Sequence, residues 1–424
     1  MRYLLNVIYG LLILLGLPWL VWAAVRKGKY RHGFAAKFLG RYPNVPPKTG
    51  RRIWIHAVSV GEVNLAAVLL KELNRRWKGY DYVITSTSRT GYELARKKFA
   101  EHAVFYAPLD FSWSVARAFR AFQPDLLVLM ELEIWPNLLA EAGRRGVPSV
   151  IVNGRLGEKS FRNYRRVLPL ISRVMKNLSL VLVQDTTCGE RFAALGVPPE
   201  KIVPTGSLKY DGARLDRNNE KTLLLKKLWG IADSDWVFLA GSTQEPEESL
   251  AVETFRTLAE EFPSLRLILV PRHPERFAEV AEMLDRQGLA WTRRTQLAEN
   301  RETPERILLV DTVGELGAWW GTARIGFVGG SMGNRGGQNM IEPAGYGVAV
   351  CFGPNTWNFR DIVRTLLDAD AARVVQNGSE MTAFVRHCLE NPAFADQLGK
   401  KAQNLVVSQQ GATAKTVDGM ERLW

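Results

Sequence analysis

The segment VGGSMGNRGGQNMIEPA, residues 328–344, joins the end of an apolar run to a Gly-rich loop and then to an expected helix that carries an early acid, Glu342. Backbone N–H groups exposed by glycine, together with a helix N-terminus, can bind a phosphate, and a nearby carboxylate can hold ribose hydroxyls. The segment therefore favours an α/β fold with a pocket for a nucleotide-linked sugar. Taken alone, it is as compatible with a tight turn that serves only close packing.

The rest of the chain alternates apolar runs with amphipathic stretches. In the first half the apolar runs cover residues 53–57, 82–85, 104–106, 126–130, 149–153, 180–184 and 202–205, with helices expected near 62–77, 90–99 and 112–121. In the second half they cover residues 237–240, 265–270, 290–292, 307–310, 325–328 and 348–352, with helices expected near 358–368, 380–390 and 393–409. This alternation is typical of parallel sheets with helices on both faces.

A polar stretch, residues 210–221, interrupts this rhythm and indicates a linker. A chain of 424 residues is long enough for two domains, each with its own core. We therefore expect an N-terminal segment at residues 1–30, a first doubly wound, Rossmann-like domain at 31–210, a linker at 211–221 and a second such domain at 222–424. Two domains of this kind face a cleft and bind ligands there, at the carboxyl ends of their strands.

The N-terminal residues 3–25 are nearly uncharged and long enough to cross most of a bilayer, which predicts a membrane anchor helix. Asn6, two glycines and Pro18 leave a kinked or partly interfacial segment open as the alternative. The cations that follow place the rest of the chain in the cytoplasm and would rest on anionic headgroups; they are Arg26, Lys27, Lys29, Arg31 and Lys37.

The net charge of +13 favours an anionic partner, such as acidic lipid or a phosphorylated substrate. Basic residues do not gather in a compact block with interleaved aromatics, so we do not expect nucleic acid as the partner. Cys188, Cys351 and Cys388 lack the spacing of a zinc site or a disulfide framework, which indicates a reducing compartment.

Acids follow the first and fourth expected strands. Glu62 would lie on the first turn of a helix, where the helix dipole favours the ionised carboxylate and hence a proton acceptor. The alternative is an ordinary acid at a helix start. His56 is expected to be buried and hydrogen-bonded. Glu131 and Glu133 come after the strand at 126–130, and strand alternation would direct both to one face, suited to positioning a hydroxyl or stabilising charge.

Other polar groups end the remaining strands. Lys209 lies beside the linker, where it could reach a phosphate or a carboxylate or simply be solvated. In the second half, Arg272 follows a strand and could bind a phosphate with two hydrogen bonds.

Two DxD-like triplets, at 233–235 and 368–370, lie in turn-like segments away from the Gly-rich loop, so we expect no metal there. The chain lacks GxGxxG in its first βα turn, GxxxxGK[ST] and GxSxG, which argues against dinucleotide oxidoreductases, P-loop enzymes and α/β-hydrolases.

Seven motifs follow one another along the chain: HAVSVGE at 56–62, MELEIWPN at 130–137, NGRLGEKS at 153–160, TGSLKYD at 205–211, PRHPERF at 271–277, DTVGEL at 311–316 and VGGSMGNRGGQNMIEPA at 328–344. With the apolar N-terminal segment, they cover essentially all of the sequence. On these motifs the chain resembles the bacterial 3-deoxy-D-manno-octulosonic acid (Kdo) transferases of lipid A core assembly.

This resemblance implies a two-domain glycosyltransferase of the GT-B type that transfers Kdo from CMP-Kdo to lipid IVA, with inversion and without a metal or other cofactor. The first domain would bind the acceptor and the second the donor. The protein would sit at the inner membrane through its N-terminal anchor, on anionic lipids, with both domains on the cytoplasmic side.

The resemblance also implies roles for individual residues. Glu62 would be the proton acceptor, and Glu131 and Lys209 would stabilise the transition state. Residues expected to bind CMP are Pro271, Arg272, Val313, Gly314, Glu315, Asn339, Met340, Ile341 and Glu342. Residues expected to support that site are Ser242, Thr243, Gly330, Gly336 and Gly337.

Two positions depart from the family pattern, because Gln244 and Gln338 stand where similar enzymes usually have histidine. Glutamine can hydrogen-bond but cannot carry a proton between groups, so a titrating role at these positions is in doubt. The sequence leaves open how many Kdo residues are added. Two alternatives also stay open: a membrane-associated transferase of another nucleotide sugar, such as a UDP-sugar, and a non-catalytic nucleotide-sugar-binding membrane protein.

Overall fold

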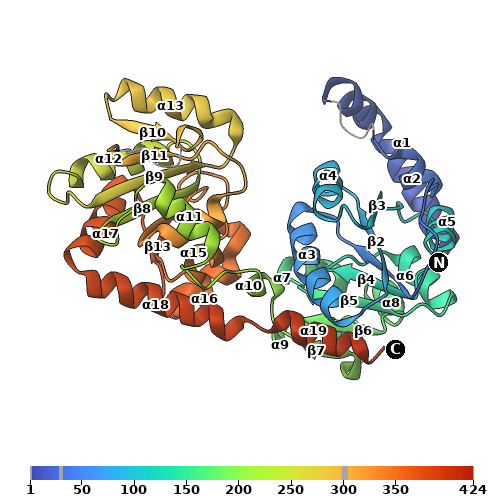
Figure 1. Ribbon diagram of the computed structural model, residues 1–424. Coiled ribbons are helices and arrows are strands. Elements are labelled where there is room, and N and C mark those ends of the chain that lie inside the picture. The colour runs from blue at the N-terminus through green and yellow to red at the C-terminus, as the bar shows by residue number, and fades with distance from the viewer. Residues whose placement is uncertain (1, 28–31, 298–303, 424) are drawn as a thin grey trace. The chain divides into compact units, whose positions relative to one another are not determined.

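A computed structural model describes residues 2–27, 32–297 and 304–423 (Figure 1). The chain forms two compact units, Met1–Gly212 with Gln410–Trp424, and Ala213–Gln409. Each unit contains a parallel seven-stranded sheet within the described residues, with strand orders β3-β2-β1-β4-β5-β6-β7 and β10-β11-β9-β8-β12-β13-β14. The predicted α/β fold with two doubly wound domains is confirmed.

The first unit holds strands β1 (Arg52–His56), β2 (Asp81–Ser86), β3 (Ala103–Tyr106), β4 (Leu126–Met130), β5 (Ser149–Gly154), β6 (Leu180–Val183) and β7 (Ile202–Pro204). Its helices are α1 (Arg2–Lys27), α2 (Phe34–Leu39), α3 (Val60–Arg76), α4 (Arg89–Lys98), α5 (Ser112–Phe122), α6 (Pro136–Arg144), α7 (Glu158–Arg165), α8 (Leu168–Met175), α9 (Thr186–Ala194), α10 (Leu208–Asp211) and α19 (Ala412–Glu421).

The second unit holds strands β8 (Trp236–Thr243), β9 (Leu265–Pro271), β10 (Trp291–Arg293), β11 (Ile307–Leu309), β12 (Ile325–Val328), β13 (Ala349–Phe352) and β14 (Arg373–Val374). Its helices are α11 (Glu220–Leu228), α12 (Glu247–Leu258), α13 (Phe277–Arg286), α14 (Leu316–Trp319), α15 (Ile341–Gly345), α16 (Arg360–Asp368), α17 (Gly378–Glu390) and α18 (Pro392–Gln409).

Strand β1 explains why the first sheet is covered on both faces. Ile53 and Ile55 point to one face and join the core under α3. Trp54 points to the other face, where its ring meets the edges of Phe119 and Phe122 of α5 at centroid distances of 5.1 and 4.9 Å. Because side chains alternate along a strand, an unbroken apolar run fills two cores at once.

In the second sheet, two glycines allow an indole ring to lie directly on the strands. A Cβ atom added to Gly326 of β12 would come within 2.8 Å of the Trp320 ring, and one added to Gly241 of β8 would also overlap that ring. Since β8 and β12 are neighbours, both glycines serve this close approach.

The last helix of the chain, α19, belongs to the first unit, whereas the sequence analysis placed all of residues 222–424 in the second domain. Val417 and Met420 complete the core on the α3 face of the first sheet. The Asp211 carboxylate at the end of α10 also accepts a hydrogen bond of 2.6 Å from the Gly411 N–H. An amphipathic pattern predicts a helix but not which of two sheets it covers.

Helix α1 is fixed to the first unit near its start. The Asn6 side chain and Ser112 of α5 exchange two hydrogen bonds, of 2.7 and 3.0 Å, and the Tyr9 hydroxyl donates to Asp110. Figure 1 shows α1 beginning beside α5 and running away from it.

Measured by length and hydropathy, none of the described helices, α1 included, meets the requirements for crossing a membrane. The spanning anchor expected over residues 3–25 is therefore not shown. Of the basic residues expected to flank it, Lys29 and Arg31 lie outside the described residues.

Candidate active site

In the first unit, the site is built at the carboxyl ends of β1, β4 and β5, which are neighbours in the sheet. Glu62 lies on the first turn of α3, directly after β1. Its carboxylate accepts hydrogen bonds of 2.8 Å from the Val58 N–H and from the Ser59 hydroxyl, and its own N–H donates to Ser59 Oγ at 3.3 Å. This reciprocal cap fixes the carboxylate at the helix start.

Burial raises the pKa of Glu62, the hydrogen bonds from Val58 and Ser59 lower it, and the charge of Glu131 raises it further, so that the net shift is upward. The sequence analysis expected the helix N-terminus to favour the ionised form. The hydrogen bonds at the helix start do lower the pKa, but the residue is only 7% exposed and desolvation outweighs them. A carboxylate with a raised pKa is a stronger base once it is deprotonated.

Glu131 follows β4 in a left-handed backbone conformation, with φ 53°. Such a φ is uncommon for a residue with a side chain and is often found at functional sites. We predicted that Glu131 and Glu133 continue the strand and so point to one face by alternation. This is wrong, because β4 ends at Met130. The turn nevertheless brings both acids to the same place, since the charges of Glu62 and Glu131 both raise the pKa of Glu133.

Asn153, near the end of β5, joins Glu131 to the start of α10, the short helix that carries Lys209. Its side-chain N–H₂ lies 3.5 Å from Glu131 Oε1, and its Oδ1 accepts a 3.0 Å hydrogen bond from the Leu208 N–H at the start of α10. Lys209 Nζ lies 3.7 Å from the same Glu131 oxygen. Asn153 also has a positive φ, of 58°. The sequence analysis gave this residue no role, although it opens one of the quoted motifs.

Glu133 and His56 form a second pair in the same site, with 3.8 Å between Glu133 Oε2 and His56 Nε2. Burial is the main cause that raises the pKa of Glu133, to about 7. The charges of Glu62 and Glu131 also raise this pKa, and a hydrogen bond from Trp135 lowers it. Burial lowers the pKa of His56 to about 4. His56 is therefore neutral at pH 7, and its 3.0 Å contact with Thr85 Oγ1 agrees with the expected buried, hydrogen-bonded residue.

In the second unit, the Gly-rich loop binds a carboxylate of the protein itself. Glu247, on the first turn of α12, accepts backbone hydrogen bonds from four N–H groups, those of Gly330 at 2.7 Å, Ser331 at 2.8 Å, Met332 at 2.9 Å and Gln244 at 2.9 Å. The expectation that these loop amides bind a phosphate is wrong for Gly330, Ser331 and Met332, because their donors are already used.

Other expected supporting residues also shape this loop. The Gly337 N–H donates to the Gly330 carbonyl at 2.7 Å, and both glycines have positive φ. A Cβ atom at Gly336 would come within 2.5 Å of the Trp357 and Asn358 side chains. The Gln244 and Gln338 side chains lie near Gly330. Gln244 and Gln338, which depart from the family pattern, are therefore close together in the second unit.

Ser242 and Thr243 end β8 beside this loop. Ser242 has φ 55°, a left-handed backbone like those of Glu131 and Asn153 at strand ends of the first unit. The Thr243 carbonyl accepts the Arg272 N–H at 3.0 Å, and its buried hydroxyl has no hydrogen-bond partner within the described residues.

Arg272 and Glu342 interact electrostatically in the second unit. Arg272 follows Pro271, the last residue of β9, and is exposed. Its positive charge lowers the pKa of Glu342, although burial raises that pKa more. The Asn339 side chain donates to Glu342 at 3.1 Å and caps the Ile341 N–H at 3.1 Å, so it orients the start of α15. An exposed guanidinium beside an oriented carboxylate can bind a phosphate next to a hydroxyl group.

The expected CMP-binding residues differ in what they offer. Glu315 is paired by two hydrogen bonds, of 2.8 and 2.9 Å, with Arg294. Burial alone would raise the pKa of Glu315, but the bonds from Arg294 and Thr312 outweigh it and lower the pKa. Val313 is 77% exposed, and Gly314 next to it has φ 93°. Met340 and Ile341 are buried, and the Ile341 N–H already donates to Asn339.

No group of three or more metal-ligating side chains occurs in residues 2–27, 32–297 and 304–423. In the DxD-like triplets, Asp235 accepts from Arg266 at 3.1 Å, and Asp370 pairs with Lys401 at 2.6 Å and with Arg373 at 2.7 Å. One acid of each triplet is therefore held in ion pairs, Asp235 with the buried Arg266 and Asp370 with two cations at the surface.

Comparisons with known proteins agree with the resemblance seen in the sequence. A family model described as 3-deoxy-D-manno-octulosonic-acid transferase (kdotransferase) matches residues 30–212. A 3-deoxy-D-manno-octulosonic acid transferase of Haemophilus influenzae is 34% identical over 400 residues, which cover 93% of this chain and 92% of the relative. One of Bordetella pertussis is 31% identical over 425 residues, 97% of each chain.

Among solved structures, UDP-GlcNAc 2-epimerase from Neisseria meningitidis, bound to UDP-GlcNAc, aligns with a TM-score of 0.59 over 88% of this chain and 100% of that chain. Its sequence is 13% identical. This likeness concerns the fold, which is that of two doubly wound domains of the GT-B type.

Proposed function

Because the chain belongs to the 3-deoxy-D-manno-octulosonic acid transferase family, we propose that it transfers Kdo from CMP-Kdo to lipid IVA with inversion and without a metal. The observation that carries the proposal is the group of carboxylates at the strand ends of the first unit, with Glu62 buried and Glu131 and Glu133 partly buried. Glu62 is held by hydrogen bonds at a helix start, and burial, with a smaller contribution from the charge of Glu131, raises its pKa. Such a carboxylate is suited to take a proton from a sugar hydroxyl.

Transfer requires that the acceptor hydroxyl lose its proton as it attacks the anomeric carbon of Kdo, while CMP leaves from the opposite face. Glu62 would accept the proton. The reacting sugar passes through an oxocarbenium-like state with positive charge at its ring, which a carboxylate stabilises. Glu131 would provide that charge, and Lys209, 3.7 Å from it, would hold it in place and meet the carboxylate of Kdo.

The second unit would hold the donor. Arg272 would bind the single phosphate of CMP, and the nearby Glu342 and Asn339 would accept and donate hydrogen bonds to the ribose hydroxyls. The exposed Val313, beside Gly314, offers an apolar surface for the base. A guanidinium can neutralise the developing charge on a monophosphate leaving group, so this chemistry does not require a divalent cation.

Helix α1 would bind the face of the membrane that carries the acceptor. Beyond its contacts with α5, it exposes large apolar side chains along its length, among them Leu11, Leu12, Leu15, Trp19 and Trp22. A helix of this kind lies in the interface of a bilayer, with its aromatic residues at the headgroups. This placement, on the cytoplasmic side of the inner membrane, would bring the site to a lipid substrate.

The test is to give the purified full-length protein CMP-Kdo and lipid IVA in detergent with EDTA, and to measure CMP release and the mass of the lipid product. The proposal predicts CMP release with a lipid heavier by one or more Kdo residues, and the mass gives their number. A UDP-sugar in place of CMP-Kdo should yield no product. Transfer from the UDP-sugar alone would contradict the donor assignment, and activity restored only by divalent metal would contradict the metal-free mechanism.

A further inference from the structure

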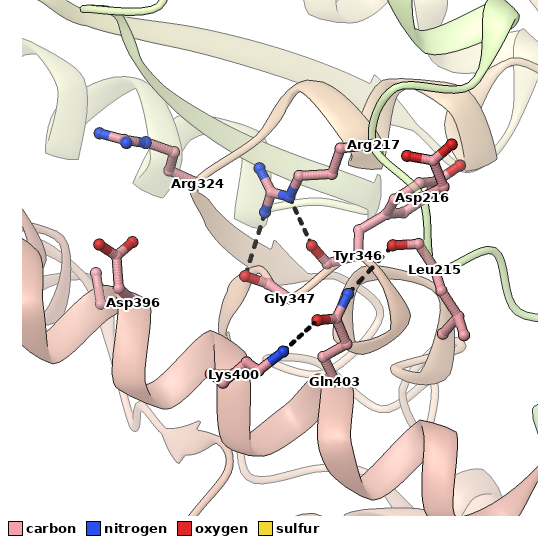
Figure 2. A pocket seen from close by; sticks show the side chains of 10 residues that line it. Leu215, Asp216, Arg217, Arg324, Tyr346, Gly347, Asp396, Lys400 and Gln403 are labelled. Atoms are coloured by element: carbon pink, nitrogen blue, oxygen red, sulfur yellow. Dashed lines mark hydrogen bonds between the residues drawn. The ribbon is translucent and has the colours of Figure 1, made fainter.

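The second unit contains a cavity of about 410 Å³ that lies apart from the residues discussed above (Figure 2). It is lined by Leu215, Asp216, Arg217, Arg324, Tyr346, Gly347, Ala395, Asp396, Lys400 and Gln403. Arg324 directly precedes β12, and Tyr346 and Gly347 precede β13. The cavity is therefore at the amino ends of these strands, whereas the Gly-rich loop follows the carboxyl end of β12. The cavity and the Gly-rich loop therefore lie at opposite ends of the strands of one sheet.

Three cationic side chains line this cavity without a carboxylate at ion-pair distance in the described part of the chain. The Arg217 guanidinium donates to the carbonyl oxygens of Tyr346 at 2.6 Å and Gly347 at 3.2 Å. Arg324 lies over the Trp236 ring, 4.5 Å from its centroid. Lys400 Nζ is 3.3 Å from Gln403 Oε1. These partners are neutral, so they leave the three positive charges uncompensated at close range.

Two acids also line the cavity, but neither neutralises these cations by direct contact. Asp216 is exposed and accepts a 2.7 Å hydrogen bond from the Asn218 N–H. Asp396 lies on α18, one turn before Lys400, and its charge acts on Arg217 from a distance. Burial is the main cause that lowers the pKa of Arg217, to about 10, and the positive charge of Arg324 lowers it as well. The negative charge of Asp396 opposes this shift. An anion near Arg217 and Arg324 would relieve this repulsion.

The walls of the cavity are held in place before any ligand binds. The Gln403 side-chain N–H₂ donates to the carbonyl oxygens of Leu215 at 3.1 Å and Gly345 at 3.0 Å, which ties α18 to both sides of the hollow. Gly347 has φ 68°, and a Cβ atom at Gly399 of α18 would overlap its carbonyl oxygen. Figure 2 shows Gln403 rising from α18 toward Leu215, with Lys400 directed along the helix to Gln403. Pre-formed walls reduce the ordering that a ligand must impose.

We propose that this cavity binds a small phosphate-bearing anion, held by Arg217, Arg324 and Lys400. Guanidinium groups bind phosphate oxygens with paired, charge-assisted hydrogen bonds, and an ammonium group adds a further donor. Free inorganic phosphate and a phosphorylated headgroup share this chemistry. The site does not depend on the transferase function proposed above, because none of its three cations belongs to the donor or acceptor residues.

The experiment titrates inorganic phosphate, and separately glycerol phosphate, into the full-length protein by isothermal titration calorimetry with CMP present in excess to occupy the donor site. The variants are Lys400→Gln and Arg324→Gln. The control is Lys401→Gln, which removes the same charge from the next residue of α18, where the lysine pairs with Asp370 outside the cavity. Because Lys400 is exposed, Lys400→Gln should fold even if the loss of the Arg324 contact with Trp236 destabilises the other variant.

We expect saturable binding that is about tenfold weaker in Lys400→Gln and Arg324→Gln and unchanged in Lys401→Gln, as the loss of one charged hydrogen bond implies. Tighter binding of glycerol phosphate would assign the site to a headgroup, and tighter binding of inorganic phosphate to the free ion. The absence of saturable binding, or equal affinity in all four proteins, would overturn the proposal. The comparison with Lys401→Gln holds even if the protein does not bind CMP.

Discussion

The carboxylate of Glu247 accepts a 2.7 Å hydrogen bond from the backbone N–H of Gly330, although the two residues are 83 positions apart in the chain. The same carboxylate binds three further backbone N–H groups and is 1% exposed. A glycine-rich loop that would otherwise attract an external anion is thus held in shape by an internal one. Ligand binding in the second unit then falls to groups around the loop rather than to these amides.

Replacing Glu247 with glutamine tests this relationship. The glutamine NH₂ group would face two of the N–H donors that Glu247 now satisfies, which leaves buried polar groups unpaired. We expect the free energy of unfolding to fall by about 2–4 kcal/mol, measured by urea denaturation. Glu253→Gln, an exposed change on the same helix, should cost less than about 0.5 kcal/mol. Equal stability of the two variants would show that the loop does not rely on Glu247.

The pKa of Glu133, raised to about 7, predicts a pH-dependent stability. The folded protein holds this proton more tightly than the unfolded chain, whose carboxyl titrates near 4.5. The free energy of unfolding should therefore fall as pH rises from about 4.5 to about 7 and then level off, by at most roughly 3 kcal/mol from this group. Glu133→Gln should flatten that part of the profile, and an unchanged slope would rule out Glu133 as its source.

Asn153 is expected to act by positioning Glu131. The change Asn153→Asp keeps the acceptor for the Leu208 N–H but replaces the donor to Glu131 with a second negative charge. We expect kcat to fall by about 10–100-fold with a small change in KM. The loss should therefore appear in kcat, and a change confined to KM would contradict the positioning role of Asn153.

Arg272 provides the test of the donor site. Arg272→Gln keeps much of the side-chain length but removes the charge that would meet the phosphate, so KM for CMP-Kdo and the Kd for CMP should both rise about tenfold or more. Arg286→Gln, an exposed change at the end of α13, is the matched control. Equal CMP affinity in the two variants would remove Arg272 from the donor site.

The positions of the strands along the chain could be read from the sequence because each strand of a doubly wound sheet is a short apolar run. The runs at 126–130 and 325–328 coincide with β4 and β12. The run at 53–57 was one residue late, since β1 spans Arg52–His56. Such patterns depend only on neighbouring residues, so they are visible without a structure.

The details of the site depend on contacts between distant segments, and these were not predictable. Nothing near Gly330 indicates that Glu247 fills its loop, and nothing near Glu131 indicates a left-handed turn that ends the strand. Burial likewise reversed the expected pKa shift of Glu62, because a helix start lowers a pKa but its depth in the protein is set by the whole fold. The positions of acids at strand ends were predictable, whereas their partners and pKa values were not.

The role of Glu62 as proton acceptor is the central claim, and single-turnover kinetics of Glu62→Gln test it most directly. Glutamine keeps the shape and can still accept the Ser59 hydrogen bond, but it cannot take a proton at neutral pH. With CMP-Kdo and lipid IVA, the rate of Kdo transfer should fall by about 100-fold or more, while the Kd for CMP stays unchanged. The control Glu72→Gln, on the same helix, should transfer at the wild-type rate. Transfer by Glu62→Gln at the rate of that control would contradict the account.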